Sequence, residues 1–265
     1  MTLQYFILGR NPELSRQELL AYNNARNNLT KEIFFDENFL LLDVKKEIDM
    51  NELGGTMKSG IIEKHGTEDD VIAYIMAGEV VNEDKFTYAV FGNADNDVFK
   101  QKFKMDKKKA MLKHGRTRLI TQDHEKINLP KASYYLILHE HNNIFYVGHI
   151  TQEYDAESVA YRDMHKPIRR EELAISPRLA KILINLSGAK EKDTLLDPFC
   201  GIGGIISEAL LKHINCYGVD IDKTAIYGAR KNLAWITAKH KKNIQAKWTV
   251  ECKNAKNVQD KQYNA

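Results

Sequence analysis

Two predicted strands of this sequence each end in an aspartate that is followed by a turn. The types and spacing of these residues suit the binding of a nucleoside. An apolar run ends at Asp197 and continues into the turn 198–204, PFCGIGG. A second run, 217–220, ends at Asp220, near the spacing at which Rossmann-like sheets place a ribose-binding carboxylate. Glycines let backbone amides approach a ligand closely. We therefore expect the turn and the Asp220 carboxylate to bind one nucleoside.

The turn differs from two better-known phosphate-binding motifs. Ile206 stands where the dinucleotide fingerprint GxGxxG needs its third glycine, and no GK[ST] follows as in a P-loop. A lone glycine turn also occurs in unrelated α/β folds. The second acidic strand end favours the binding interpretation over that alternative.

A third strand end, 251–255, places Asn254 where its amide can bond an adenine edge. Asp222 is interpreted as a helix N-cap, because it directly precedes Lys223 and Thr224. Cys200 is interpreted as a small buried residue of the turn, without chemistry. The expected cofactor-binding residues are Asp197, Phe199, Gly201, Gly203, Asp220, Ile221, Asn254 and Ala255.

The elements around these residues alternate between strand and helix. Ser176 and Pro177 predict a helix start that leads to Gly188. The pattern then predicts strands at 194–197, 216–220 and 247–252, with helices to about Lys212 and about His240 between them. This order predicts a parallel, Rossmann-like α/β sheet.

The first half is predicted to be α+β. We expect strands at 3–9, 58–63, 87–91, 117–121, 134–139 and 144–150, and a hairpin of 33–35 with 39–44. Ser15 and Glu18 have the spacing of a capping box that opens a helix through Leu20, and Thr67 caps a second helix. Gly54 and Gly55 mark a turn.

A basic stripe covers residues 100–118, with apolar positions at rough helix spacing. Such stripes are usually solvated helix faces, but this one contains a single acid, Asp106, which favours contact with phosphate. Arg169 and Arg170 belong either to a solvated linker or to a second phosphate contact. The residues expected to contact the phosphates of a nucleic acid are Lys107, Lys108, Lys109, Lys113, Arg116, Arg169 and Arg170.

Composition and residue spacing argue against disulfides, metal sites and a membrane helix. The net charge of +3 says little about partners. Three widely spaced cysteines without a CxxC pair argue against disulfides and thiolate metal sites, and fit a reducing cytoplasm. No apolar run is long enough for a membrane helix. His139, Glu140 and His141 lack zinc-helix spacing and are expected at a hairpin end, so no metal is expected.

The segments DPFCGIGG (197–204) and GVDID (218–222) resemble the first motifs of class I S-adenosylmethionine methyltransferases. Together with residues 5–15, 53–56, 161–163 and 176–180, they resemble archaeal-type THUMP-domain tRNA guanosine-N2 methyltransferases. The resemblance implies a ferredoxin-like subdomain (1–55), an RNA-binding THUMP domain (56–152), a linker (153–175) and the front part of a Rossmann-like methyltransferase domain (176–265). It also implies S-adenosylmethionine as cofactor and the exocyclic amine of a tRNA guanosine as acceptor.

The chain departs from the family pattern at two places. Asn254 stands where the family usually has aspartate, and residues 257–265 contain no Asp/Asn-Pro-Pro-Tyr loop to hold the acceptor amine. The catalytic residues are therefore unknown, this chain alone is expected to be inactive, and the missing part of the domain is a candidate partner. Two other functions remain open: a non-catalytic RNA-binding module, and an amino-methyltransferase that acts on DNA or protein.

Overall fold

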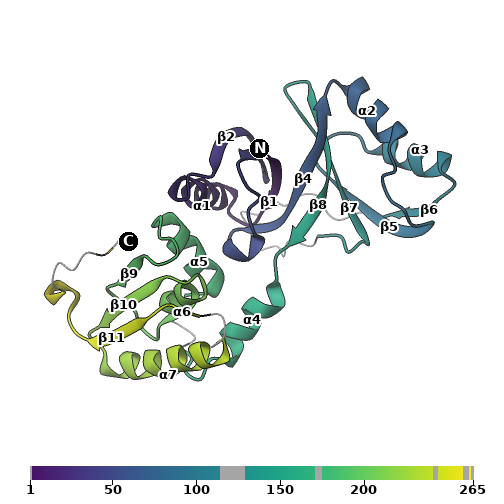
Figure 1. The fold of residues 1–265 in the computed structure, drawn as a ribbon. Coiled ribbons are helices and arrows are strands. Elements are labelled where there is room, and N and C mark those ends of the chain that lie inside the picture. The colour runs from purple at the N-terminus through teal and green to yellow at the C-terminus, as the bar shows by residue number, and fades with distance from the viewer. Residues whose placement is uncertain (1, 114–128, 171–174, 241–243, 259–262, 264–265) are drawn as a thin grey trace. The chain divides into compact units, whose positions relative to one another are not determined.

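The computed structural model describes residues 2–113, 129–170, 175–240, 244–258 and 263. The chain forms two compact units (Figure 1). The N-terminal unit comprises residues 1–12, 29–50 and 56–154, and the second unit comprises residues 13–28, 51–55 and 155–265. No helix in the described part of the chain is both long and apolar enough to cross a membrane.

One eight-stranded sheet organises the N-terminal unit, in the order β2-β3-β1-β4-β8-β7-β5-β6. β5 runs parallel to β6 and β7, and the other pairs are antiparallel. The strands are β1 (Thr2–Leu8), β2 (Leu29–Asp36), β3 (Phe39–Val44), β4 (Thr56–Gly66), β5 (Lys85–Phe91), β6 (Lys109–Leu112), β7 (Tyr134–His141) and β8 (Ile144–Glu153). Two helices, α2 (Glu68–Ala77) and α3 (Asp97–Met105), complete this unit, and the 3-10 turn η1 (Met50–Glu52) begins at its last residue before 51–55.

The sheet curls around an aromatic core. Tyr5 on β1 and His139 on β7 are hydrogen-bonded at 3.0 Å, although two strands separate β1 from β7 in the sheet. Phe34 and Phe39 pack in the same cluster. A second cluster lies under α2 and α3 and includes Phe99 and Phe103. Burial lowers the pKa of His139 to about 4, so this histidine is a neutral core residue at pH 7.

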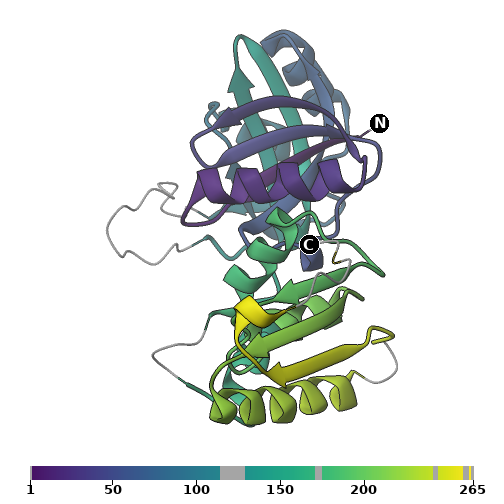
Figure 2. The same cartoon turned by 90° about the vertical axis from the view of Figure 1, so that its left-hand side faces the viewer.

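A parallel three-stranded sheet organises the second unit, in the order β11-β10-β9. Its strands are β9 (Thr194–Asp197), β10 (Asn215–Asp220) and β11 (Trp248–Cys252). Its helices are α1 (Pro12–Ala25, with Pro12 counted in the other unit), α4 (Ala156–His165), α5 (Pro177–Leu186), α6 (Gly204–Leu211) and α7 (Lys223–Lys239), with the 3-10 turn η2 (Ala255–Asn257). α6 packs on β9 and β10, and α7 packs on β10 and β11 (Figure 2).

Polar contacts join residues 13–28 and 51–55 to α5 and α6 within the second unit. The Glu18 carboxylate accepts hydrogen bonds from the amides of Gly54 (2.8 Å) and Gly55 (2.7 Å) and from the Asn185 side chain (2.7 Å). Lys212 on α6 forms an ion pair with Glu52. A Cβ at residue 54 would lie 2.2 Å from the Arg178 carbonyl oxygen, so glycine is required there.

The predicted capping box at Ser15 and Glu18 is wrong. α1 begins at Pro12, and both residues lie inside the helix. Ser15 donates to the Gly55 carbonyl (2.9 Å), and Glu18 binds the glycine amides described above. Proline at the first helical position needs no amide partner, which explains the earlier start.

The predicted helix over the basic stripe is confirmed for residues 100–105 and wrong for residues 109–112. α3 ends at Met105, and residues 109–112 form the edge strand β6. The chain reverses at Lys107, which has a left-handed φ of 57°, while Lys108 donates to the Phe103 carbonyl. The predicted strand 117–121 lies outside the described residues. The segment predicted as a linker contains α4, which Asp155 caps.

Candidate functional site

The carboxyl ends of the three parallel strands gather the acidic and polar residues at one edge of the sheet. Asp197 ends β9 and pairs in register with Gly218 of β10, two residues before Asp220. Asp220 in turn pairs with Cys252 of β11. Open α/β sheets bind ligands at this edge.

The turn after β9 is fixed directly to the end of β10. The Gly201 amide donates to Asp220 Oδ2 (2.9 Å), and the Cys200 amide donates to the Val219 carbonyl (2.9 Å). Gly201 and Gly203 have φ values of 50° and 81°, a region that side chains rarely adopt. A Cβ at residue 201 would meet no atom within 4 Å. Open space therefore lies over the half-buried backbone of Gly201.

The Asp220 carboxylate is half-buried and organised by backbone amides. Its Oδ1 accepts from the Asp222 amide (2.9 Å), in addition to the Gly201 bond on Oδ2. Each carboxylate oxygen has a second acceptor position. The Asp220 carbonyl accepts from the Lys253 amide (2.9 Å), which ties the third strand end to the same residue.

Two neighbouring groups have displaced pKa values. Burial raises the pKa of Asp197 to about 6, the Phe199 amide partly offsets this, and the Asp220 charge adds to it. Burial, with the charges of Asp197 and Asp220, raises the pKa of the Cys200 thiol to about 12. Cys200 is thus an un-ionised buried thiol at pH 7, which disfavours a nucleophilic role.

Exposed apolar side chains flank the carboxylate. Phe199 is 78% exposed and Ile221 is 75% exposed, values that are high for such large apolar residues. Asn254 is also exposed, and its side-chain oxygen caps η2 by accepting from the Lys256 amide (2.9 Å). Ala255 begins η2. All eight expected cofactor-binding residues therefore lie at or directly after the strand ends of this sheet.

Sequence reasoning missed the tertiary contacts of three residues in and around this site. Asp222 caps α7 as predicted, but it also forms an ion pair with Arg170 (2.8 Å). Asn232 in the middle of α7 bonds both residue 168 and residue 202. A Cβ on Gly218 would lie 2.5 Å from Ile206, so this glycine lets β10 approach α6. None of these partners is signalled by local sequence.

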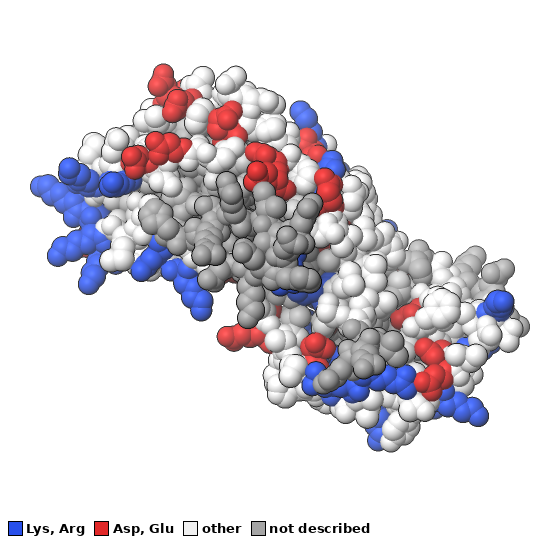
Figure 3. Space-filling model, turned by 180° about the vertical axis from the view of Figure 1, so that it is seen from behind, with Lys and Arg blue, Asp and Glu red and all other residues white. Residues whose placement is uncertain are grey.

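The expected RNA-binding lysines lie on or near α3 and β6 of the N-terminal unit. Lys107 and Lys109 are exposed, and Figure 3 shows basic side chains gathered at this edge of the unit. Lys108 is half-buried and donates to the Val81 carbonyl. Lys113 is half-buried, and its amide extends the pairing of β6 by donating to Tyr88. Arg116 lies outside the described residues.

The two histidines at the end of β7 pack against aromatic side chains of the N-terminal unit. His139 contacts Tyr5 and lies 3.4 Å from Asp36, and His141 stacks on Phe34. The predicted hairpin of β7 and β8 is confirmed. Within the ranges that the structure describes, no three potential metal ligands cluster.

Comparison with known proteins identifies relatives of both halves of the chain. Residues 167–264 match the family described as RMKL-like, methyltransferase domain. A tRNA (guanine(10)-N2)-dimethyltransferase of Methanothermobacter thermautotrophicus is 50% identical over 60 residues, which is 23% of this chain and 18% of that protein. A Pyrococcus abyssi protein of the same name is 26% identical over 240 residues, 88% of this chain and 68% of that one.

A solved structure supports the fold. TrmN from Thermus thermophilus matches with a TM-score of 0.50 and 12% identity, over 95% of this chain and 73% of that chain. The predicted fold class, an α+β region followed by a Rossmann-like α/β unit, is confirmed. The motif resemblance to the archaeal-type guanosine-N2 methyltransferases is confirmed by the named relatives, of which the first is matched over less than a fifth of its length.

Proposed function

We infer that the second unit binds S-adenosylmethionine and serves the methylation of a guanosine amine in tRNA, and the match of residues 167–264 to the RMKL-like methyltransferase domain supports this. The observation that carries this inference is the hydrogen bond from the Gly201 amide to the Asp220 carboxylate. It brings the open side of a glycine backbone and a carboxylate suited to ribose hydroxyls to one edge of the sheet. The named relatives support guanosine in tRNA as the acceptor.

The residues present fit the cofactor. The half-buried Asp220 carboxylate has free acceptor positions for ribose hydroxyls, and exposed Phe199 and Ile221 offer apolar surface to an adenine ring. The open space over Gly201 gives a ligand access to the backbone. Asn254 and Ala255 would contact the adenine edge from the third strand end.

The bound cofactor supplies an electrophilic methyl group on a sulfonium. The chain's own residues bind and orient it, so that catalysis depends on positioning and needs no enzyme nucleophile. The un-ionised Cys200 thiol agrees with this division of roles. Asp197 and Asp220 give the edge two carboxyl groups, which favours a cationic ligand over an anionic one.

The N-terminal part of the chain, residues 1–152, is the proposed RNA-binding part. We assign the ferredoxin-like and THUMP roles to residues 1–55 and 56–152, and the methyltransferase role to residues 176–265, with 153–175 between them. The exposed lysines of α3 and β6 supply positive charge for phosphate contacts. Arg169 is proposed as a further RNA contact. Arg170 would have to leave Asp222 to act in the same way.

Calorimetric titration of S-adenosylhomocysteine into the full chain tests the proposed function. We expect saturable one-site binding, because the product shares the adenosyl group that the strand ends recognise. ATP is the matched control, since its triphosphate adds negative charge beside two carboxyl groups and should bind at least about tenfold more weakly. A folded sample that gives no heat and no thermal shift with S-adenosylhomocysteine would contradict the proposal.

Replacing Lys107 and Lys109 together by glutamine should reduce the salt dependence of tRNA binding. If both contact phosphate, the slope of log Kd against log salt concentration should decrease by about 1.5. Fluorescence anisotropy with labelled tRNA between low and moderate salt measures this slope. The matched control replaces Lys190 and Lys192, exposed at the amino ends of the strands with the same spacing. Equal slopes for both double variants would exclude the β6 lysines as the RNA contact.

A further inference from the structure

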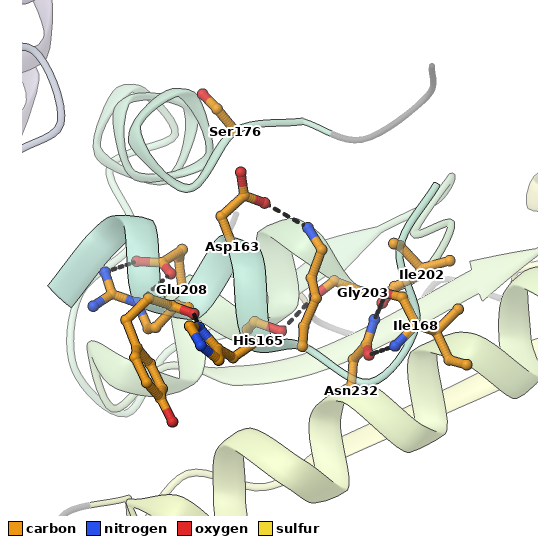
Figure 4. A network of polar contacts seen from close by, with 12 residues as sticks. Asp163, His165, Ile168, Ser176, Ile202, Gly203, Glu208 and Asn232 are labelled. Atoms are coloured by element: carbon orange, nitrogen blue, oxygen red, sulfur yellow. Dashed lines mark hydrogen bonds and ion pairs between the residues drawn. The ribbon is translucent and has the colours of Figure 1, made fainter. Parts of the chain in front are cut away.

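A single buried side chain joins the glycine turn to a segment that precedes the parallel sheet in sequence. Asn232 on α7 is 3% exposed. Its Nδ2 donates to the carbonyls of Ile202 and Ile168, both at 3.0 Å, and its Oδ1 accepts from the Ile168 amide at 2.9 Å (Figure 4). The Asn232 side chain thereby binds Ile168, which lies 64 positions earlier in the chain. It also fixes the Ile202 carbonyl in the middle of the turn.

The segment 166–170, which we call the strap, is held at two further points. Lys166 pairs with Asp163 of α4 (2.7 Å; Figure 4). Arg170 pairs with Asp222 (2.8 Å), whose amide donates to the Asp220 carboxylate. The strap is therefore attached both to the turn that carries Gly201 and to the loop that follows Asp220. These are the two loops of the proposed cofactor site.

Close packing accompanies these bonds. A Cβ on Gly228, one turn before Asn232 on α7, would lie 3.1 Å from a methyl group of Ile168 and 3.1 Å from one of Ile202. Glycine is unfavourable inside a helix, so its presence here has a packing reason. It lets α7 approach the strap and the turn together.

We propose that Asn232 is a positioning residue for the cofactor. The turn contains two glycines in left-handed conformations, which are flexible unless other groups fix them. By holding the Ile202 carbonyl between those glycines, Asn232 keeps the turn in the conformation that presents Gly201 beside Asp220. A ligand then meets a preformed site and loses less affinity to ordering of the loop. This proposal rests on the proposed binding of S-adenosylmethionine.

The experiment compares Asn232→Ala with Asn185→Ala. Asn185 is the matched control, because it is also fully buried in the second unit and also donates two hydrogen bonds, to Glu18 and to the Glu52 carbonyl. Both variants should have a lower Tm. Only Asn232→Ala should raise the Kd for S-adenosylhomocysteine, by about 10- to 30-fold, at a temperature where both variants are folded. The Kd of Asn185→Ala should stay within about twofold of wild type.

The outcomes separate this proposal from the one on which it rests. If wild type does not bind S-adenosylhomocysteine, the proposed function fails and the positioning role fails with it. If wild type binds and Asn232→Ala binds equally well, only the positioning role is overturned. The positioning role is also overturned if Asn185→Ala loses as much affinity as Asn232→Ala, because the loss of affinity would then result from general destabilisation.

Gly228→Ala provides a second variant in case Asn232→Ala does not fold. Alanine favours the helix more than glycine does. If the contact between α7 and the strap had no role, Gly228→Ala should therefore be more stable than wild type and bind S-adenosylhomocysteine with the same Kd. We instead expect about three- to tenfold weaker binding of S-adenosylhomocysteine, because the new methyl group presses on Ile168 and Ile202. A stabilised Gly228→Ala with wild-type Kd would overturn the role of the strap contact.

Discussion

Asp220→Ala is expected to raise the Kd for S-adenosylhomocysteine at least about 100-fold. The substitution would remove the two charge-assisted hydrogen bonds that we propose Asp220 makes to ribose, each contributing about 1.5 to 3 kcal/mol. It also leaves the Gly201 and Asp222 amides without their acceptor, so the turn after β9 and the loop after β10 lose their common anchor. Calorimetry with the full chain measures the change. Asp220→Asn, which retains one acceptor oxygen, should give an intermediate value.

Asp193→Ala is the control for that measurement. Asp193 lies at the opposite end of β9 and accepts from the Lys190 amide (3.0 Å), so its loss also removes a carboxylate that organises a turn. We expect a Kd within about twofold of wild type, because the amino ends of the strands are remote from the proposed ligand. Similar losses at Asp193 and Asp220 would mean that the calorimetric effect reports stability. The assignment of Asp220 to the ribose would then be withdrawn.

Glu18→Ala is expected to lower the free energy of unfolding of the second unit by about 3 to 5 kcal/mol. The substitution leaves three donors without acceptors, at Gly54, Gly55 and Asn185, and an unsatisfied buried donor costs about 1 to 3 kcal/mol. Denaturant unfolding followed by tryptophan fluorescence measures this unit alone. The two tryptophans of the chain, Trp235 and Trp248, both lie in it.

Glu13→Ala is the matched control on the same helix. Its carboxylate is exposed and lies 3.7 Å from Arg16, a surface pair that contributes about 0 to 1 kcal/mol. Glu18→Gln should fall between the two alanine variants, because its amide oxygen can serve only one of the glycine amides well. If Glu18→Ala were no more destabilising than Glu13→Ala, the buried contacts of α1 would have no energetic significance.

Local patterns were sufficient to predict most of the second unit. Ser176 caps α5 and Asp222 caps α7, because capping involves residues only two or three positions apart. The strand ends at Asp197 and Asp220 follow from apolar runs that stop at an acid. Parallel pairing of neighbouring strands then places those acids at one edge without further information.

Contacts between distant residues were not predictable in the same way. Ser15 and Glu18 have capping-box spacing, yet their partners are Gly54 and Gly55, about 40 positions away. Asn232 resembles any polar residue of a helix until its partners at 168 and 202 are known. In each case tertiary hydrogen bonds decide the role, and a single sequence does not reveal which segments meet.

The basic stripe shows a different limitation. Lysine-rich composition and loosely spaced apolar residues fit a helix, but after the left-handed turn at Lys107, residues 109–112 of the stripe form the edge strand β6. A short edge strand that begins with a lysine and is flanked by others is also protected against pairing with other chains. The same residues therefore satisfy two patterns, and pairing with β5 selects the strand.

Residues 13–28 and 51–55 belong to the second unit. This limits where the chain can be divided when one of its parts is exchanged, during evolution or by engineering. A chimaera that joins residues 155–265 to a foreign RNA-binding region loses Glu18 and Glu52 and leaves Asn185 and Lys212 without these partners. Domain shuffling at that junction should therefore give insoluble products unless the helix and the glycine loop are transplanted as well. Transfer of residues 13–28 and 51–55 together with residues 155–265 avoids this loss.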